Sequence, residues 1–195
     1  MKSLEGMLNE HTLVLITPDA VKRGLIGEII GRFEKTGLRI VACKMISATR
    51  EQLAGHFPKS EEWILGMGEK TLESCHEDGI DPRKLLGTAD SYTIGLKIKK
   101  WNYSYLMNGP IVLMVLEGVH AIGTVRKLVG NTSPCKATPG TIRGDFSIDS
   151  PILANIMKRA SENIIHASET PEEAKQEIAN WFSPNEIQSY EKKSE

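Results

Sequence analysis

The residues best suited to do chemistry in this chain are its histidines, because a neutral imidazole can attack an electrophile without first losing a proton. There are five: His11, His56, His76, His120 and His166. His166 closes a short apolar run, and Glu177 follows on the next expected helix. A carboxylate there could accept a hydrogen bond from the second ring nitrogen and fix the tautomer. A histidine at a strand end is also a common structural residue, so spacing alone leaves both interpretations open.

A second group of polar residues could bind phosphate. Arg126 lies on an expected helix, Arg143 lies in the irregular segment that follows, and Thr132 lies between them. The planar fork of arginine matches the oxygens of a phosphate, and a threonine hydroxyl adds a donor. The three side chains could converge on a polyphosphate if the segment folds back. Each of them alone is an ordinary surface residue.

Hydrophobic periodicity predicts the elements that must position these side chains. Apolar runs predict strands at 12–16, 38–46, 111–117 and 163–166. Helical spacing predicts helices at 26–33, 50–56, 91–107, 119–129 and 171–182, with shorter helical pieces at 60–76, 82–86 and 150–160. Thr49 and Thr170 are the expected N-caps of two of these helices. Residues 131–147 show no periodicity, and we interpret them as an ordered binding loop.

The order of these elements predicts the fold class. It is α+β, an α/β sandwich of the ferredoxin-like βαββαβ type, with a four-stranded antiparallel sheet covered by helices. The 195 residues are expected to form a single domain. A polar C-terminal tail, expected to fray, begins at about residue 186.

Composition excludes several function classes. The formal net charge of −1 gives no reason to expect nucleic-acid or membrane binding. Cys43, Cys75 and Cys135 form no CxxC pair, so neither a disulfide framework nor a zinc site is indicated. The N-terminal segment lacks an apolar stretch of signal-peptide length, and the longest apolar run, 111–116, is too short to span a bilayer. We therefore expect a cytoplasmic protein.

Four long segments share their residues and their order with one enzyme family. The first is 12–34, which contains Leu-Val-Leu-Ile-Thr-Pro-Asp, and the second is Gly-Pro-Ile-Val-Leu-Met-Val-Leu-Glu-Gly at 109–118, which continues with Val-Arg-Lys-Leu-Val-Gly at 125–130. The third is Pro-Gly-Thr-Ile-Arg-Gly-Asp-Phe at 139–146, and the fourth is Asn-Ile-Ile-His-Ala-Ser-Glu at 163–169. In these segments, which extend over nearly the whole chain, the sequence resembles the nucleoside diphosphate kinases.

The resemblance implies a ping-pong exchange, in which a nucleoside triphosphate phosphorylates a histidine and a diphosphate then takes the phosphoryl group. His166 matches the phosphate carrier of the family, and Glu177, with Ser168 near it, matches the carboxylate that orients the carrier. Asn163 matches the residue that reaches the sugar hydroxyl.

The same resemblance assigns the ligands. Arg126, Thr132 and Arg143 match phosphate-binding residues of the family. ATP and other nucleoside di- and triphosphates are the implied substrates. Magnesium would be held mainly by the nucleotide phosphates, with no metal site on the protein, in agreement with the lack of a carboxylate cage in the sequence. A homo-oligomer, hexameric or tetrameric, is also implied.

The chain departs from the family pattern at several positions. Thr17 stands where the family has a lysine that contacts phosphate and sugar, and loss of one such donor costs on the order of 3–4 kcal/mol. Phe57 stands where the family has a tyrosine near the site. Insertions at about 58–92 and 149–161 resemble a longer form of these kinases. The first insertion replaces the segment with the base-stacking aromatic, for which Trp63 is the available candidate.

Alternatives to an active kinase therefore stay open. Thr17 favours a catalytically weakened homologue that still binds nucleotide, whereas the intact His166, Arg126 and Arg143 favour the active enzyme. A nucleic-acid-binding regulator gains no support from the near-neutral charge.

Overall fold

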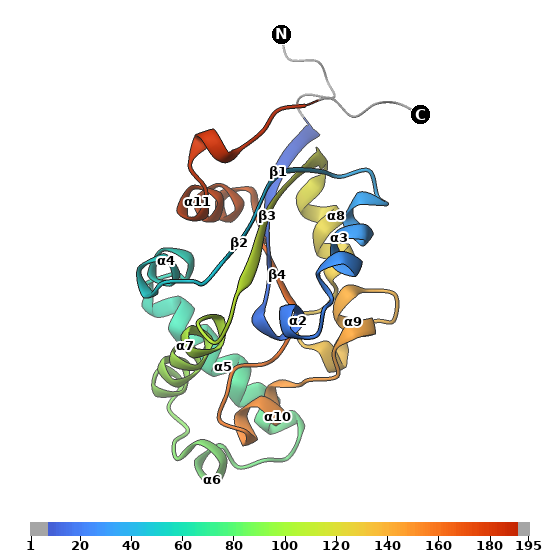
Figure 1. The fold of residues 1–195 in the computed structure, drawn as a ribbon. Helices are drawn as coiled ribbons and strands as arrows, with labels where there is room; N and C mark the ends of the chain where they lie inside the picture. Colours follow the sequence, from blue (N-terminus) through green and yellow to red (C-terminus); the bar gives the residue numbers. More distant parts are fainter. Residues whose placement is uncertain (1–7, 191–195) are drawn as a thin grey trace.

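A four-stranded antiparallel sheet forms the centre of the protein (Figure 1). The computed structural model describes residues 8–190. Its strands lie in the order β2-β3-β1-β4, with the bounds β1 (Asn9–Ile16), β2 (Arg39–Ile46), β3 (Ile111–Val119) and β4 (Ile165–Ala167). The antiparallel sheet confirms the predicted fold class.

The two central strands, β1 and β3, are buried on both faces, and this burial explains why their sequences are continuous apolar runs rather than alternating ones. Leu13 and Leu15 of β1 lie in a core on one face of the sheet, and Val14 and Ile16 lie in a core on the other face. Successive side chains of a strand point to opposite faces, so a strand covered on both sides is apolar throughout.

Helices cover both faces. The core with Val14 and Ile16 includes residues of α2 (Pro18–Lys22), α3 (Ile26–Glu34), α8 (Ala121–Val129) and α9 (Ile142–Phe146). The core with Leu13 and Leu15 includes residues of α4 (Arg50–His56), α7 (Ser91–Leu106) and α11 (Pro171–Trp181). In Figure 1 these two groups of helices flank the sheet on its right and left sides.

The remaining helices gather at one end of the molecule (Figure 1). They are α5 (Glu61–Glu77), α6 (Pro82–Leu86) and α10 (Pro151–Ile156). Two short 3₁₀ helices, at Pro134–Lys136 and Pro184–Glu186, lie elsewhere in the chain. α5 packs along α7, and α10 contacts both α5 and α6. The two segments predicted as insertions therefore pack against each other. Within residues 8–190, no helix combines the length and apolar character needed to cross a membrane.

Several predicted bounds were wrong for local reasons. The segment 131–147 is ordered as predicted, but it contains a 3₁₀ helix and α9, which is capped by the Thr141 hydroxyl. The last strand begins at Ile165 rather than 163, because Ile164 has a φ of 73° and cannot continue an extended strand. The segment after 186 contacts the sheet, since the backbone N–H of Gln188 donates to the Val41 carbonyl at 2.7 Å, and the expected fraying of the tail stays a prediction.

The close crossing of α5 and α7 depends on glycine, and it gives a stability prediction. A Cβ atom on Gly95 would lie 2.0 Å from the backbone oxygen of Ile64. We expect Gly95→Ala to lower the free energy of unfolding by about 1–3 kcal/mol, because backbone atoms must move apart. Gly66→Ala is the control, since no atom lies within 4 Å of its added Cβ and alanine favours the helix. Denaturant midpoints measure both effects, and equal midpoints for the two variants would contradict the prediction.

Candidate active site

The short strand β4 presents His166 at the edge of the sheet. His166 pairs with Leu15 of the central strand β1, and its neighbours Ile165 and Ala167 are buried. The side chain of His166 keeps 33% of its surface exposed, so a substrate can reach it. Buried Ile164, two residues earlier, has the left-handed φ of 73°. A β-branched residue in this region costs on the order of 1–3 kcal/mol, and such strain is often found at functional sites.

The Glu177 carboxylate holds the His166 ring from the protein side. His166 Nε2 lies 2.7 Å from Glu177 Oε1. The other carboxylate oxygen, Oε2, accepts a hydrogen bond from the Ser168 hydroxyl at 2.6 Å. Glu177 and Ser168 are both buried. The predicted pairing of Glu177 with His166 is therefore present in the structure, and Ser168 fixes the carboxylate that makes it.

Local sequence explains why Glu177 faces the strand. The Thr170 hydroxyl caps α11 by accepting a hydrogen bond from the Glu173 amide, and Pro171 occupies the first helical position. The Glu173 carboxylate in turn accepts from the Glu169 amide at 2.7 Å, which completes the turn between β4 and α11. This capped start fixes the phase of the helix, and Glu177 falls on its buried face.

His56 is a site residue that sequence reasoning did not assign. Its Nδ1 lies 3.0 Å from the same oxygen, Glu177 Oε1, that contacts His166. The two imidazole rings meet edge to face, with centroids 4.8 Å apart. His56 ends α4 and is buried, and the Trp181 indole nitrogen lies 3.4 Å from its Nδ1. The sequence signal that could have indicated it is its position directly before Phe57, which matches a site position of the family.

The charge of Glu177 favours one assignment of the two His166 nitrogens. Burial opposes ionisation of Glu177, but hydrogen bonds from His166 and His56 outweigh it and hold the pKa of that carboxyl well below its usual range. An ionised carboxylate can only accept a hydrogen bond, so the nitrogen that faces it, Nε2 of His166, carries the hydrogen. Nδ1 then bears the free lone pair, and it is the nitrogen available for attack.

The lowered pKa of Glu177 predicts how stability depends on pH. Because the folded pKa lies below the ordinary value of 4.5, the unfolded chain binds the proton first as pH falls. We expect wild-type protein to lose stability below about pH 4.5, and Glu177→Gln to lose less over the same interval. Glu172→Gln, which removes an exposed carboxyl on the same helix, should behave like wild type. Denaturant midpoints from about pH 7 to about pH 3 test this, and parallel curves for all three proteins would refute it.

Arg143 is held by three backbone carbonyls around β4. Its guanidinium donates to the oxygens of Asn163 at 3.2 Å, Gly130 at 3.0 Å and Ile165 at 2.6 Å. Burial, with a smaller contribution from the positive charge of Arg126, lowers the pKa of Arg143 to about 10, so the group stays charged at neutral pH. Three of its five N–H groups are used, which leaves two for a ligand.

The other two predicted phosphate-binding residues are less tightly held. Arg126 on α8 is half-buried, and its guanidinium lies 3.4 Å from Glu169 Oε1. It is close enough to Arg143 for its positive charge to lower the pKa of that residue. Thr132 is exposed in the loop after α8, and its hydroxyl makes no hydrogen bond to another of residues 8–190. The structure thus places the two arginines near each other, and Thr132 lies two residues after Gly130, whose carbonyl accepts from Arg143.

The second predicted insertion supports the segment that carries Asn163. Buried Asp149 accepts two hydrogen bonds from Arg159, at 2.7 and 3.1 Å, and one from the Glu162 amide at 2.6 Å. Asn163 follows directly, and its carbonyl accepts from the Arg143 side chain. Its own side-chain amide makes no hydrogen bond within the described part of the chain, and it can therefore bind a ligand.

Thr17 and Phe57 flank this arrangement. The Thr17 amide donates to the Ile164 carbonyl at 3.0 Å, and its buried hydroxyl donates to the Asp19 carboxylate at 2.5 Å. The Tyr105 hydroxyl donates to the same carboxylate oxygen. Phe57 packs on the ring of His56, with centroids 5.1 Å apart. Thr17 is therefore hydrogen-bonded to the residue before the histidine strand, and the ring of His56 lies between Phe57 and His166.

The fold and the site together define a class of protein. A four-stranded antiparallel sheet presents a partly exposed histidine whose Nε2 contacts a buried carboxylate, which leaves Nδ1 free, and two charged arginines lie near it. These are the requirements of a phosphotransferase that uses a histidine, since phosphoryl transfer needs an activated nucleophile and positive charge on the transferred oxygens.

Comparison with known proteins specifies the family. The model of the family described as nucleoside diphosphate kinase matches residues 10–64 and 99–187, which leaves 65–98, within and just after the predicted first insertion, unmatched. A nucleoside diphosphate kinase of Pyrobaculum aerophilum is 53% identical over 178 residues, which cover 91% of this chain and 97% of the relative. One of Archaeoglobus fulgidus is 38% identical, over 95% of each chain.

Solved structures of nucleoside diphosphate kinases support the same family assignment. The crystal structure of an NDP kinase from Pyrobaculum aerophilum superimposes with a TM-score of 0.89 at 50% identity and covers 93% of this chain and all of its own. A transition-state mimic of the nucleoside-diphosphate kinase from Borrelia burgdorferi, with bound vanadate and ADP, superimposes with a TM-score of 0.75 at 33% identity, over 95% of this chain and 94% of that one. The chain belongs to the nucleoside diphosphate kinase family, and its reaction is the transfer of a phosphoryl group from a nucleoside triphosphate to a nucleoside diphosphate.

Proposed function

We propose that His166 carries the phosphoryl group in a ping-pong exchange. Nδ1 attacks the terminal phosphorus of a nucleoside triphosphate, a nitrogen–phosphorus bond forms, and the phosphorus–oxygen bond to the departing diphosphate breaks. A second nucleoside diphosphate then attacks the phosphorus and the imidazole leaves. The observation that supports this most directly is the 2.7 Å contact of Nε2 with the ionised Glu177, which leaves Nδ1 as the free nucleophile.

The other residues bind and orient the substrate in this proposal. Arg143 and Arg126 neutralise charge on the phosphate oxygens, and Arg143 is preorganised because three backbone carbonyls hold it. Thr132 adds a hydroxyl donor from its loop, and the Asn163 amide binds the sugar hydroxyl. As the phosphoryl group leaves the nucleotide, the Glu177 carboxylate stabilises the positive charge that develops on the imidazole. Phe57 and Trp63, whose centroids lie 5.6 Å apart, are candidates for the surface that faces the base.

Magnesium is proposed to enter with the nucleotide. Among residues 8–190, the cluster of potential metal ligands is His56, His166 and Glu177, which contributes two ring nitrogens and one carboxylate oxygen. Magnesium prefers six oxygen ligands, so this cluster does not suit it. The nucleotide phosphates supply the oxygens instead, and the metal would neutralise part of their charge. A single domain with two insertions, a homo-oligomer of six or four chains and a cytoplasmic location stay predictions from the sequence.

Steady-state kinetics test the exchange. With ATP as donor and GDP as acceptor, we expect parallel lines in double-reciprocal plots, because the first diphosphate leaves before the second binds. Exchange should persist when the bases of donor and acceptor are varied, since the proposed contacts address phosphates and sugar. Intersecting lines would indicate direct transfer between two bound nucleotides and would contradict the proposal.

Among the departures from the family pattern, the replacement of a lysine by Thr17 is expected to affect the rate of phosphoryl transfer most. A lysine at this position could reach Asp19 and the phosphates, and one preorganised cationic donor contributes on the order of 3–4 kcal/mol to phosphoryl transfer. We expect Thr17→Lys to raise kcat/KM by about 10²-fold. Thr17→Val, which removes only the hydroxyl, is the matched control and should not raise it. If Thr17→Lys leaves kcat/KM at the wild-type value, the residues present already supply the charge that the reaction needs.

A further inference from the structure

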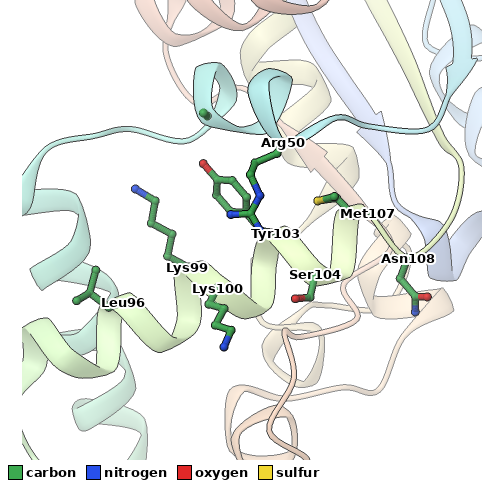
Figure 2. A pocket seen from close by; sticks show the side chains of 9 residues that line it. Arg50, Leu96, Lys99, Lys100, Tyr103, Ser104, Met107 and Asn108 are labelled. Atoms are coloured by element: carbon green, nitrogen blue, oxygen red, sulfur yellow. The ribbon is translucent and has the colours of Figure 1, made fainter.

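A groove of about 920 Å³ lies between α4 and α7, outside the site described above. Figure 2 shows Arg50 reaching from α4 toward α7, while Lys99 and Lys100 extend from α7. None of His166, Glu177, Arg126 and Arg143 lines it. The groove therefore excludes the histidine and the phosphate-binding arginines, and it borders the proposed base-facing rings, since Tyr103 stacks on Phe57 and Lys99 lies near Trp63.

The charge of this groove is one-sided. Arg50, Lys99 and Lys100 line it, and no aspartate or glutamate does. None of the three cations forms a salt bridge with another residue in the described range 8–190, where other lysines such as Lys44 and Lys136 do. This concentration of positive charge stands on a chain with a net charge of −1. Its local field favours an anionic ligand.

Within residues 8–190, Arg50 and Lys99 contact aromatic rings and donate no hydrogen bond to another residue. The Arg50 guanidinium lies 6.0 Å from the ring centroid of Tyr103, and the Lys99 ammonium lies 5.8 Å from that of Trp63. The face of an aromatic ring attracts a positive charge, but it does not use up the N–H donors of the arginine or the lysine. The two side chains are thus placed over the groove while their donors can bind a ligand.

The shape of the groove points to an extended ligand rather than a single small ion. Residues of α7, namely Leu96, Lys99, Lys100 and Tyr103, and Met107 directly after it line the groove. Eleven residues of helix rise about 16 Å, which exceeds the size of one phosphate. Ser104 and Asn108 add neutral hydrogen-bond donors along this length. Several cations and donors spread along this length suit a ligand with several phosphate groups.

We propose that the groove between α4 and α7 is a second binding site for a phosphate-chain ligand, either the triphosphate of a nucleotide or an inorganic polyphosphate. The site is connected to the catalytic histidine through packed rings. Tyr103 stacks on Phe57 with centroids 5.4 Å apart, Phe57 packs on His56, and His56 packs on His166. The ligand binds in addition to the substrate, so the proposal goes beyond the phosphoryl exchange.

Counting binding sites tests the proposal. Titration calorimetry with inorganic tripolyphosphate on the full chain should show two classes of site in the wild type. The triple variant R50Q/K99Q/K100Q should lose one class, with at least about tenfold weaker binding, because charge-assisted hydrogen bonds are removed. Arg126→Ala should lose the other class. The double variant K35Q/K84Q removes exposed cations that do not line the groove, and it should titrate like wild type.

A second arm distinguishes the sources of the phosphate chain. An ATP analogue with a β,γ-imido bridge cannot phosphorylate His166, so its binding can be compared with that of tripolyphosphate. Equal affinity at the groove assigns recognition to the phosphate chain alone, and tighter binding of the analogue assigns the nucleotide. A triple variant that still binds two equivalents of tripolyphosphate would overturn the proposal. So would a groove that binds a single-stranded oligonucleotide more than about tenfold more tightly than either phosphate ligand.

Discussion

Replacing His166 with alanine is expected to abolish phosphoryl exchange, with a loss of kcat of at least about 10⁴-fold. The reason is that Nδ1 of this ring is the proposed point of attachment, and no other group can take its place. His56 is the nearest imidazole, but it is buried, and burial lowers its pKa and separates it from the substrate. Its Nδ1 also lies 3.0 Å from Glu177 Oε1 and is directed toward that carboxylate.

The control for this variant is another histidine. His76→Ala removes an exposed imidazole from α5, and it should keep wild-type exchange. Nucleotide binding by His166→Ala should stay within a few-fold of wild type, since the arginines that bind phosphate are unchanged. Coupled-assay rates and equilibrium dialysis measure the two quantities. Residual exchange within about tenfold of wild type would assign the nucleophile to another residue.

Replacing Arg143 with alanine is expected to damage both stability and rate. Three backbone carbonyls at β4 and after α8 would lose their donor, and each buried acceptor left unpaired costs about 1–3 kcal/mol. We therefore expect the free energy of unfolding to fall by about 3 kcal/mol or more. The loss of a preorganised cation should lower kcat by a further 10²–10³-fold, on the order of a removed oxyanion donor.

Arg126→Ala separates the two effects. Among residues 8–190, the ion pair of its guanidinium is with the exposed Glu169 carboxylate, at 3.4 Å, and such pairs contribute little to stability. We expect a comparable loss of kcat with an almost unchanged denaturant midpoint. If Arg143→Ala unfolds at the same denaturant concentration as Arg126→Ala, the three carbonyl contacts do not stabilise the loop as the structure indicates.

Much of the scaffold could be predicted because its physical causes are local. The central strands are apolar throughout since both faces are covered, and this pattern is visible in the sequence. Thr49 was expected to cap α4, and it forms a full capping box with Gln52. Thr170 and Pro171 likewise start α11, which positions Glu177.

Several features of the candidate site could not be predicted, because they depend on contacts between segments that are distant in the sequence. His56 and Glu177 are joined only when α4 and α11 pack side by side on the same face of the sheet. Arg143 could be recognised as a phosphate-binding residue, but its bonds to Gly130 and Ile165 require the loop to fold back on β4. The left-handed φ of Ile164 has no sequence indication, since β-branched residues disfavour it.

Isolation of the phosphorylated intermediate tests the central claim most directly. The protein is incubated with magnesium and ATP labelled at the terminal phosphate, and it is then digested at alkaline pH to preserve nitrogen–phosphorus bonds. The account predicts one acid-labile phosphoryl group per chain, on Nδ1 of His166, that GDP removes with formation of labelled GTP. A label on any other residue, or an unlabelled protein that still exchanges phosphate between nucleotides, would contradict it.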